Sequence, residues 1–169
     1  MTTPETELII REFRQGDEAA FRRLNEEWIV RYFAVEPKDE ASFADPQGTI
    51  LDRGGRIFLA IRASQPVGCC ALLAMAPAEF EVAKMAVTGS SQRAGIGRRL
   101  LEQAIAAARV AGAHRLYLET NRKLEGAIRL YESLGFRHLP PERTVRSAYA
   151  RADVYMELYL DEITRCTDA

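Results

Sequence analysis

Long apolar runs, an excess of charge and a cysteine pattern are all missing from this sequence. No apolar stretch approaches the roughly 20 residues of a membrane span, and the opening MTTPETELII has neither the basic segment nor the apolar core of a signal peptide. The net charge is −1, so the chain as a whole is not attracted to nucleic acid or to an anionic membrane. These absences predict a cytoplasmic protein that binds neither.

Cysteine is scarce, and its placement gives no disulfide pattern. Of the three cysteines, Cys69 and Cys70 are adjacent within an apolar run, so we interpret them as small buried side chains in a reducing compartment. Linkers, internal repeats and low-complexity tracts are absent too. Residues 1–169 are therefore expected to form a single domain that is long enough to bury a core.

The apolar periodicity predicts a mixed α/β domain. Repeats near 3.6 residues predict helices over 18–33, 96–111 and 125–134, while residues 34–55 look irregular except for a short helix near 45–52. Apolar runs and alternating segments bounded by turn residues predict the strands, which are 7–13, 56–62, 67–75, 79–88, 115–119, 136–139 and 153–160. We expect the helix pair 96–111 and 125–134 to pack on one sheet.

A glycine turn stands between a predicted strand and a predicted helix, in SSQRAGIGRRLLEQ (90–103). The unpaired N–H groups of a helix N-terminus attract phosphate oxygens, and glycine lets a ligand approach the backbone closely. Gly95 and Gly97 therefore indicate a pyrophosphate site, although they are equally consistent with a tight turn alone. The Rossmann fingerprint would need glycine where Leu100 stands, and no P-loop lysine follows.

Two motifs resemble the GNAT superfamily of acetyl-CoA-dependent N-acetyltransferases. QRAGIG (92–97) matches the superfamily signature Q/R-x-x-G-x-G/A. The segment 116–137 resembles its second motif, a strand followed by a helix with Ala127, Tyr131, Gly135 and Phe136 in the expected positions. The resemblance covers roughly residue 56 to the end. It implies a single α/β domain with a mixed, mostly antiparallel sheet, splayed parallel strands and flanking helices.

The resemblance also implies acetyl-CoA as co-substrate and no metal. The pyrophosphate would rest on the glycine turn, and the pantetheine arm would pair with strand backbone as an added strand does. The residues implied are Met85, Ala86, Val87, Gln92, Arg93, Ala94, Gly95, Ile96, Gly97, Arg98, Asn121 and Ala127. The family often has asparagine where Leu124 stands here, so Asn121 either reaches the pantetheine arm from a longer loop or only caps the turn.

The implied reaction is direct attack of a primary amine on the thioester. The amine must first lose a proton, and the departing thiolate must gain one. Tyr131 occupies the position of the family's usual acid, and its phenol suits protonation of the thiolate. Glu81 is the candidate base, acting directly or through water, although Glu79 and Glu119 compete for that role.

The amine substrate is expected to be a small molecule or a peptide. Carboxylates and aromatic rings over residues 26–40 could hold a cationic amine or could be a solvated helix face, and Trp28 is interpreted as a core residue. The loop residues Ser147, Tyr149, Arg151 and Asp153 could line the amine site, where an arginine would suit a carboxylate-bearing substrate. An acetyl-CoA-binding regulatory module, O-acylation and transfer of a longer acyl group stay open, as do monomer and homodimer.

Overall fold

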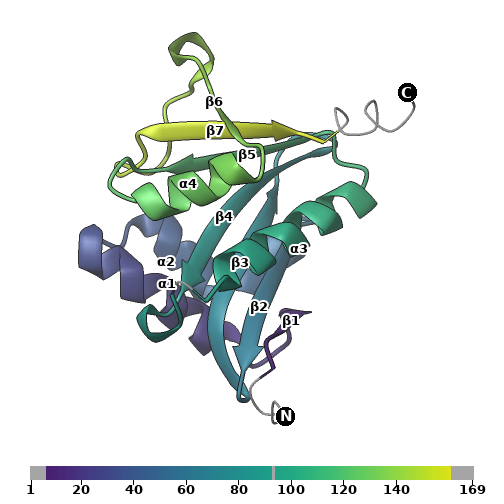
Figure 1. The fold of residues 1–169 in the computed structure, drawn as a ribbon, viewed down its shortest axis with the longest axis vertical. Coiled ribbons are helices and arrows are strands. Elements are labelled where there is room, and N and C mark those ends of the chain that lie inside the picture. The colour runs from purple at the N-terminus through teal and green to yellow at the C-terminus, as the bar shows by residue number, and fades with distance from the viewer. Residues whose placement is uncertain (1–6, 93, 161–169) are drawn as a thin grey trace.

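Seven strands form one sheet in the computed structural model, which describes residues 7–92 and 94–160 (Figure 1). The order across the sheet is β1-β2-β3-β4-β5-β7-β6. The strands are β1 (Ile9–Glu12), β2 (Arg56–Arg62), β3 (Gln65–Ala74), β4 (Glu79–Val87), β5 (Arg115–Thr120), β6 (Arg137–His138) and β7 (Val154–Tyr159). The mixed, mostly antiparallel sheet implied by the family resemblance is confirmed.

The strands β4 and β5 make the one parallel pair among the described strands, and they stay together only briefly. Their register runs from Glu79 opposite Arg115 to Val82 opposite Leu118. Beyond that point β4 continues to Val87 and β5 to Thr120 without pairing. There β4 stays paired with β3 and β5 with β7, but the edges that β4 and β5 turn toward each other have no strand partner, so the sheet splays into a gap in its middle.

Helices cover both faces of the sheet (Figure 1). On one face, α3 (Ile96–Val110) and α4 (Glu125–Ser133) pack over a core that includes Leu100, Leu116 and Met156. On the other face, α1 (Glu18–Tyr32), α2 (Pro37–Ala44) and the short π-helix η2 (Gln47–Leu51) pack over a second core. Cys69 and Cys70 are both fully buried, as their apolar surroundings predicted. No helix in the described part of the chain is both long and apolar enough to cross a membrane.

The segment before β2 is more helical than the sequence suggested. The prediction of irregular structure over 37–44 was wrong, because α2 occupies those residues. Pro37 stands at the start of α2, where its missing N–H costs nothing, and Glu36 and Asp39 form a reciprocal capping box. The short helix expected near 45–52 is present as η2.

A bulge in β4 changes the alternation of its side chains between the α3/α4 core and the α1/α2 core. The β3–β4 register shifts between Cys69 and Ala71, and Lys84 has a left-handed backbone with φ +51°. Before the bulge Val82 packs against the α3/α4 core, and after it Met85 does. The bulge therefore turns Lys84 away from that apolar core and toward α1 and α2.

Candidate active site

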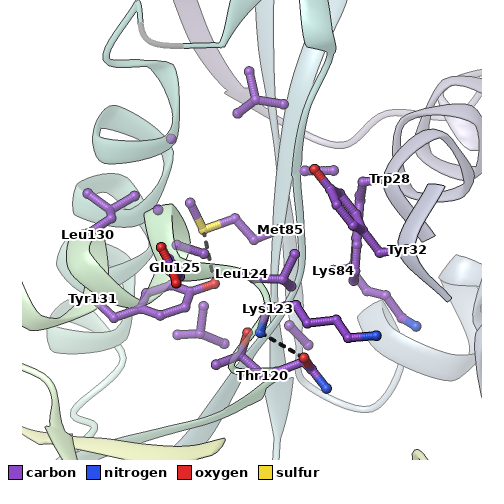
Figure 2. A pocket seen from close by; sticks show the side chains of 18 of the residues that line it. Trp28, Tyr32, Lys84, Met85, Thr120, Lys123, Leu124, Glu125, Leu130 and Tyr131 are labelled. Atoms are coloured by element: carbon purple, nitrogen blue, oxygen red, sulfur yellow. Dashed lines mark hydrogen bonds between the residues drawn. The ribbon is translucent and has the colours of Figure 1, made fainter. Parts of the chain in front are cut away.

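A cavity of about 780 Å³ opens where β4 and β5 part, which is a volume typical of pockets that hold drug-sized ligands. Four regions line it: the end of α1, the second half of β4, the N-terminus of α3, and β5 with α4. The loop that leads into β7 closes it. Figure 2 shows Tyr131 and Leu130 on one side of β4, and Lys84, Trp28 and Tyr32 on the other.

Glycine is favoured at the two positions of the turn for different structural reasons. Gly95 is the residue before α3 and has φ +74°, a left-handed conformation that glycine adopts without strain. Gly97 has an ordinary backbone, but a Cβ there would lie 3.2 Å from the Met85 methyl group and 3.4 Å from Leu130 Cδ2. The absence of a side chain at Gly97 thus keeps the backbone of α3 close to the opening between β4 and α4.

Most of the residues implied as cofactor ligands line the cavity. They are Met85, Ala86, Val87, Gln92, Gly95, Ile96, Gly97, Arg98, Asn121 and Ala127. Ala94 is exposed and is not among the lining residues, and Arg93 lies outside the described residues. The Arg98 guanidinium donates to Ser133 Oγ at 2.7 Å, so it also ties α3 to α4.

Asn121 has protein partners at both ends of its amide. Its Nδ2 donates to the Arg151 carbonyl at 2.7 Å, and its Oδ1 accepts from the Lys123 N–H at 2.8 Å. These bonds cap the turn before α4 and join it to the chain that leads into β7. Of the two sequence-based alternatives, the structure thus provides the contacts of the capping role.

Tyr131 lies at the bottom of the opening between β4 and α4. Its side chain is buried, and its hydroxyl donates to Met85 Sδ at 3.8 Å (Figure 2). Burial raises the pKa of the phenol well above its usual range, so Tyr131 stays protonated at neutral pH. A thioether is a weak hydrogen-bond acceptor, so the Tyr131 O–H can turn toward a better acceptor in the cavity at little cost.

The three candidate bases, Glu79, Glu81 and Glu119, differ in their position relative to the cavity. Glu79 accepts from Arg115 at 3.3 Å and is not among the cavity residues, whereas Glu81 and Glu119 both line the cavity. Within the described residues Glu81 has no hydrogen-bond or ion-pair partner. Burial, and to a lesser extent the charge of Glu119, raises the pKa of Glu81 to about 7. Glu81 can therefore take up a proton near neutral pH.

A buried ionic network beside Glu81 was not predicted from the sequence. Lys84 Nζ donates to Asp39 Oδ1 at 2.6 Å and to Tyr149 Oη at 2.9 Å, while Arg151 binds Asp39 through both terminal nitrogens at 2.6 and 2.7 Å. The exposed fractions of the Asp39, Lys84 and Arg151 side chains are 0%, 4% and 13%. The signal that could have found it is Lys84, a lysine within the apolar second half of β4 (VAKMAV).

The carboxylates of α1 and α2 are engaged within the protein. Arg22 binds Glu26 and Glu40, and Arg151 binds Glu36 and Asp39. Glu27 accepts from Thr88 and from the Gly89 N–H, which fixes the turn after β4 to α1. The acidic segment 26–40 therefore stabilises the walls of the site, and its carboxylates are already bound to protein donors.

Trp28 has two roles in the structure. It packs against the α1/α2 core, as expected, and it also lines the cavity. The aromatic rings near it are covered by the protein's own cations: the Arg151 guanidinium lies 5.7 Å from Trp28 and 4.4 Å from Tyr149, and Lys123 Nζ lies 5.7 Å from Phe33. These ring faces are thus stacked on side chains of the chain itself.

Comparison with known proteins agrees with this arrangement. The profile of the Acetyltransferase (GNAT) family matches residues 18–136. The chain is 31% identical over 97 residues to the uncharacterized N-acetyltransferase YvbK of Bacillus subtilis, a stretch that covers 56% of this chain and 63% of that relative.

Solved structures share the whole fold. An acetyltransferase of the GNAT family from Staphylococcus aureus Mu50 matches with a TM-score of 0.83 and 19% identity, covering 91% of this chain and 99% of the other. The yncA structure from Salmonella typhimurium, which contains its cofactor acetyl-CoA, matches with a TM-score of 0.74 and 22% identity, covering 92% and 95%. With the family profile covering most of the sequence, this chain belongs to the GNAT acetyltransferase family.

Proposed function

We propose that the protein is an N-acetyltransferase that transfers an acetyl group from acetyl-CoA to a primary amine of a small molecule or peptide by direct attack. The observation that carries the proposal is the cavity at the parting of β4 and β5. It joins a buried, protonated Tyr131 on the α4 side to a carboxylate, Glu81, whose pKa is raised to about 7 on the α1/α2 side.

The cavity suits the co-substrate in the residues it offers. The N-terminus of α3, with Gly95 and Gly97, would hold the pyrophosphate. The edge of β4 that faces away from β3, from Met85 to Val87, would pair with the pantetheine amides. The close approach at Gly97 favours this fit, because a side chain there would enter the opening. Acetyl-CoA would supply the acetyl group as a thioester, whose carbon–sulfur bond breaks as the nitrogen–carbon bond forms.

The side chains would then handle the protons. A primary ammonium with a pKa of roughly 10.4 is almost fully protonated at neutral pH, so it needs a base. Glu81 would take that proton at its carboxylate, alone or through a water molecule. Tyr131 Oη would hold the proton that the departing sulfur requires.

Two measurements test the proposal. Calorimetric titration with acetyl-CoA, with NAD as the control ligand, tests the co-substrate site. Amine-dependent release of CoA, measured with free L-amino acids, spermidine and a lysine peptide, tests transfer. Binding of acetyl-CoA without release of CoA for any amine would instead favour a regulatory module that senses the co-substrate.

Replacement of Tyr131 by phenylalanine separates chemistry from binding. Tyr131→Phe removes the hydroxyl and keeps the ring, so we expect kcat to fall about 10²-fold or more while the Kd for acetyl-CoA stays within about twofold. Tyr159→Phe, a change on a half-exposed residue outside the cavity, serves as the matched control. An unchanged kcat in Tyr131→Phe would remove Tyr131 from the mechanism.

A further inference from the structure

The α1/α2 side of the cavity has two walls of opposite hydrogen-bonding character. We call Glu81 and Glu119 the carboxylate wall, and Lys84, Tyr149 and Arg151 the donor wall; all five residues line the cavity. What each wall can still bind follows from counting which donors and acceptors the protein has already used.

Behind the donor wall, Asp39 has all its acceptor positions filled, while several donors of the wall are left. Asp39 Oδ1 accepts from Lys84 and Arg151, and Asp39 Oδ2 accepts from Arg151 and the Glu36 N–H, which fills its four lone-pair positions. Lys84 uses two of its three N–H groups, and Arg151 uses three of its five. The Tyr149 hydroxyl accepts from Lys84, and its own proton has no partner among the described residues.

The carboxylate wall has the opposite inventory. Glu119 is fixed by Tyr117 Oη, which donates to it at 3.0 Å, and by Ser147 Oγ, which donates to its other oxygen. Each oxygen keeps one free lone pair. Glu81 supplies two further oxygens that no described residue binds. This wall accepts hydrogen bonds and, while the carboxylates are ionised, offers no donor.

The two walls face the same small space. The loop before β7 joins them directly, since Ser147 binds Glu119 and Tyr149, two residues later, binds Lys84. Burial is the main cause of the raised pKa of both Glu81 and Tyr149, and charges across the gap act as well: Lys38 and Lys84 partly offset the rise at Glu81, while Asp39, Glu81 and Glu119 add to the rise at Tyr149. Lys38 Nζ lies 4.8 Å from the Tyr149 ring and adds positive charge to the donor side.

From these walls we propose the chemical class of the amine substrate: an amine with a carboxylate or carbonyl oxygen on the neighbouring carbon, which is the α-amino-acyl group. Its nitrogen binds Glu81 and Glu119, and its oxygen binds Lys84 and Tyr149. The inference rests on the proposed acetyltransfer and narrows it. A simple alkylamine or a polyamine would leave the third N–H of the buried Lys84 and the Tyr149 hydroxyl proton without an acceptor.

Matched sets of amines test this directly. Phenylalanine, phenylalaninamide and phenethylamine share one side chain and differ only in the oxygen-bearing group, as do leucine, leucinamide and isoamylamine. We expect kcat/KM for the acid or the amide to exceed that for the plain amine by at least roughly tenfold. A preference for the acid identifies a free amino acid, whereas equal use of acid and amide identifies a carbonyl as sufficient, as at a peptide N-terminus.

The variant Tyr149→Phe tests whether the Tyr149 hydroxyl is responsible for the preference for the acid or amide over the plain amine. It removes the hydroxyl with its unpartnered proton and keeps the ring beneath Arg151, so the acid and amide should lose roughly tenfold in kcat/KM while the plain amine loses little. Tyr155→Phe is the matched control, because Tyr155 lies on β7 outside the cavity. An equal loss for all three compounds would show a structural effect and overturn the assignment of Tyr149.

Binding of the same compounds, measured with and without CoA, keeps the inference independent of turnover. Tighter binding of the acid or amide than of the plain amine supports the inference even if no acetylation is seen, in which case only the proposed transfer fails. Equal binding of all three, or acetylation of spermidine and phenethylamine as efficiently as of phenylalanine, overturns the inference and leaves the transferase activity standing.

Discussion

Glu81, the proposed base, has a charged form that works against the stability of the fold. Its folded pKa of about 7 lies above the ordinary value of 4.5, so the folded state holds this proton more tightly than the unfolded chain does. The resulting stabilisation is complete below about pH 4.5 and is lost as the pH rises through about 7. At neutral pH and above, the ionised carboxylate destabilises the fold while being ready to act as a base.

Glu81→Gln should therefore change activity and stability in opposite directions. If Glu81 is the base, activity of the native protein rises with pH through about 7, and the variant loses that limb along with most of its turnover. Relative to the native protein, the variant's free energy of unfolding should improve by about 3 kcal/mol between about pH 4.5 and pH 8. Urea unfolding at both pH values measures this; a constant difference would mean that Glu81 titrates normally. Full activity of the variant across the range would end its role as base.

At this scale the sequence identifies single residues better than pairs. Tyr131 and Gly97 were recognisable because motif and local spacing define them. The Lys84–Asp39 pair is separated by 45 residues, and the Arg151–Asp39 pair by 112, so only the fold brings them together. Strict alternation would also have placed Lys84 with Val82 on the apolar face, and the bulge prevents this.

Among the elements, α2 depends on one buried carboxylate. Asp39 joins α2 to β4 through Lys84 and to the loop before β7 through Arg151, and these contacts hold the pKa of Asp39 down to about 2 despite its burial. A depressed pKa means that this stabilisation is present above the ordinary value of 3.8 and is lost as the pH falls through about 2. Asp39 therefore stays ionised at neutral pH and keeps holding Lys84 and Arg151 of the donor wall in place.

Asp39→Asn should destabilise the protein by about 3–5 kcal/mol, because Lys84 and Arg151 would remain buried without a full counter-charge. Urea unfolding at neutral pH measures the loss. Glu40→Gln provides the control on the same helix: its carboxylate is exposed and binds Arg22, so solvent screens the pair and we expect little change in stability. Similar losses in the two variants would contradict the view that burial makes the Asp39 contacts important.

Helices and strands were predicted correctly where the apolar periodicity was strong. A helix was missed where its capping residues, and not its periodicity, mark its start. The helix α3 has a clear apolar stripe, and the alternation of β7 is equally plain. The helix α2 has few apolar residues in its eight, so its period was weak, and its real signals were Pro37 and the capping pair Glu36 and Asp39.

On the scale of the whole molecule, the sheet consists of two halves with a short seam. Only four residue pairs join β4 to β5, and α3 and α4 cover the opening from one side. The order of elements along the chain predicts a mixed sheet, but where the strands part depends on β4 and β5 diverging in space. A ligand in the gap would contact both halves, so it should stabilise the whole fold and not merely one loop.

Acetyl-CoA at about 100 times its Kd should accordingly add about 2.7 kcal/mol to the free energy of unfolding, which is a Tm increase of roughly 5–10 °C for a domain of this size.

Gly97→Ala should reduce that ligand-induced increase in Tm by more than half, because the new methyl group would narrow the opening beside Met85. Gly126→Ala is the matched control. Both glycines are second residues of helices and gain the same helix propensity, but a Cβ at Gly126 meets nothing within 4 Å. Since the Met85 methyl is the flexible end of a side chain, the fold itself tolerates Gly97→Ala, and the Tm without ligand should not fall. A full ligand-induced increase in Gly97→Ala would place the bound co-substrate away from the α3 N-terminus.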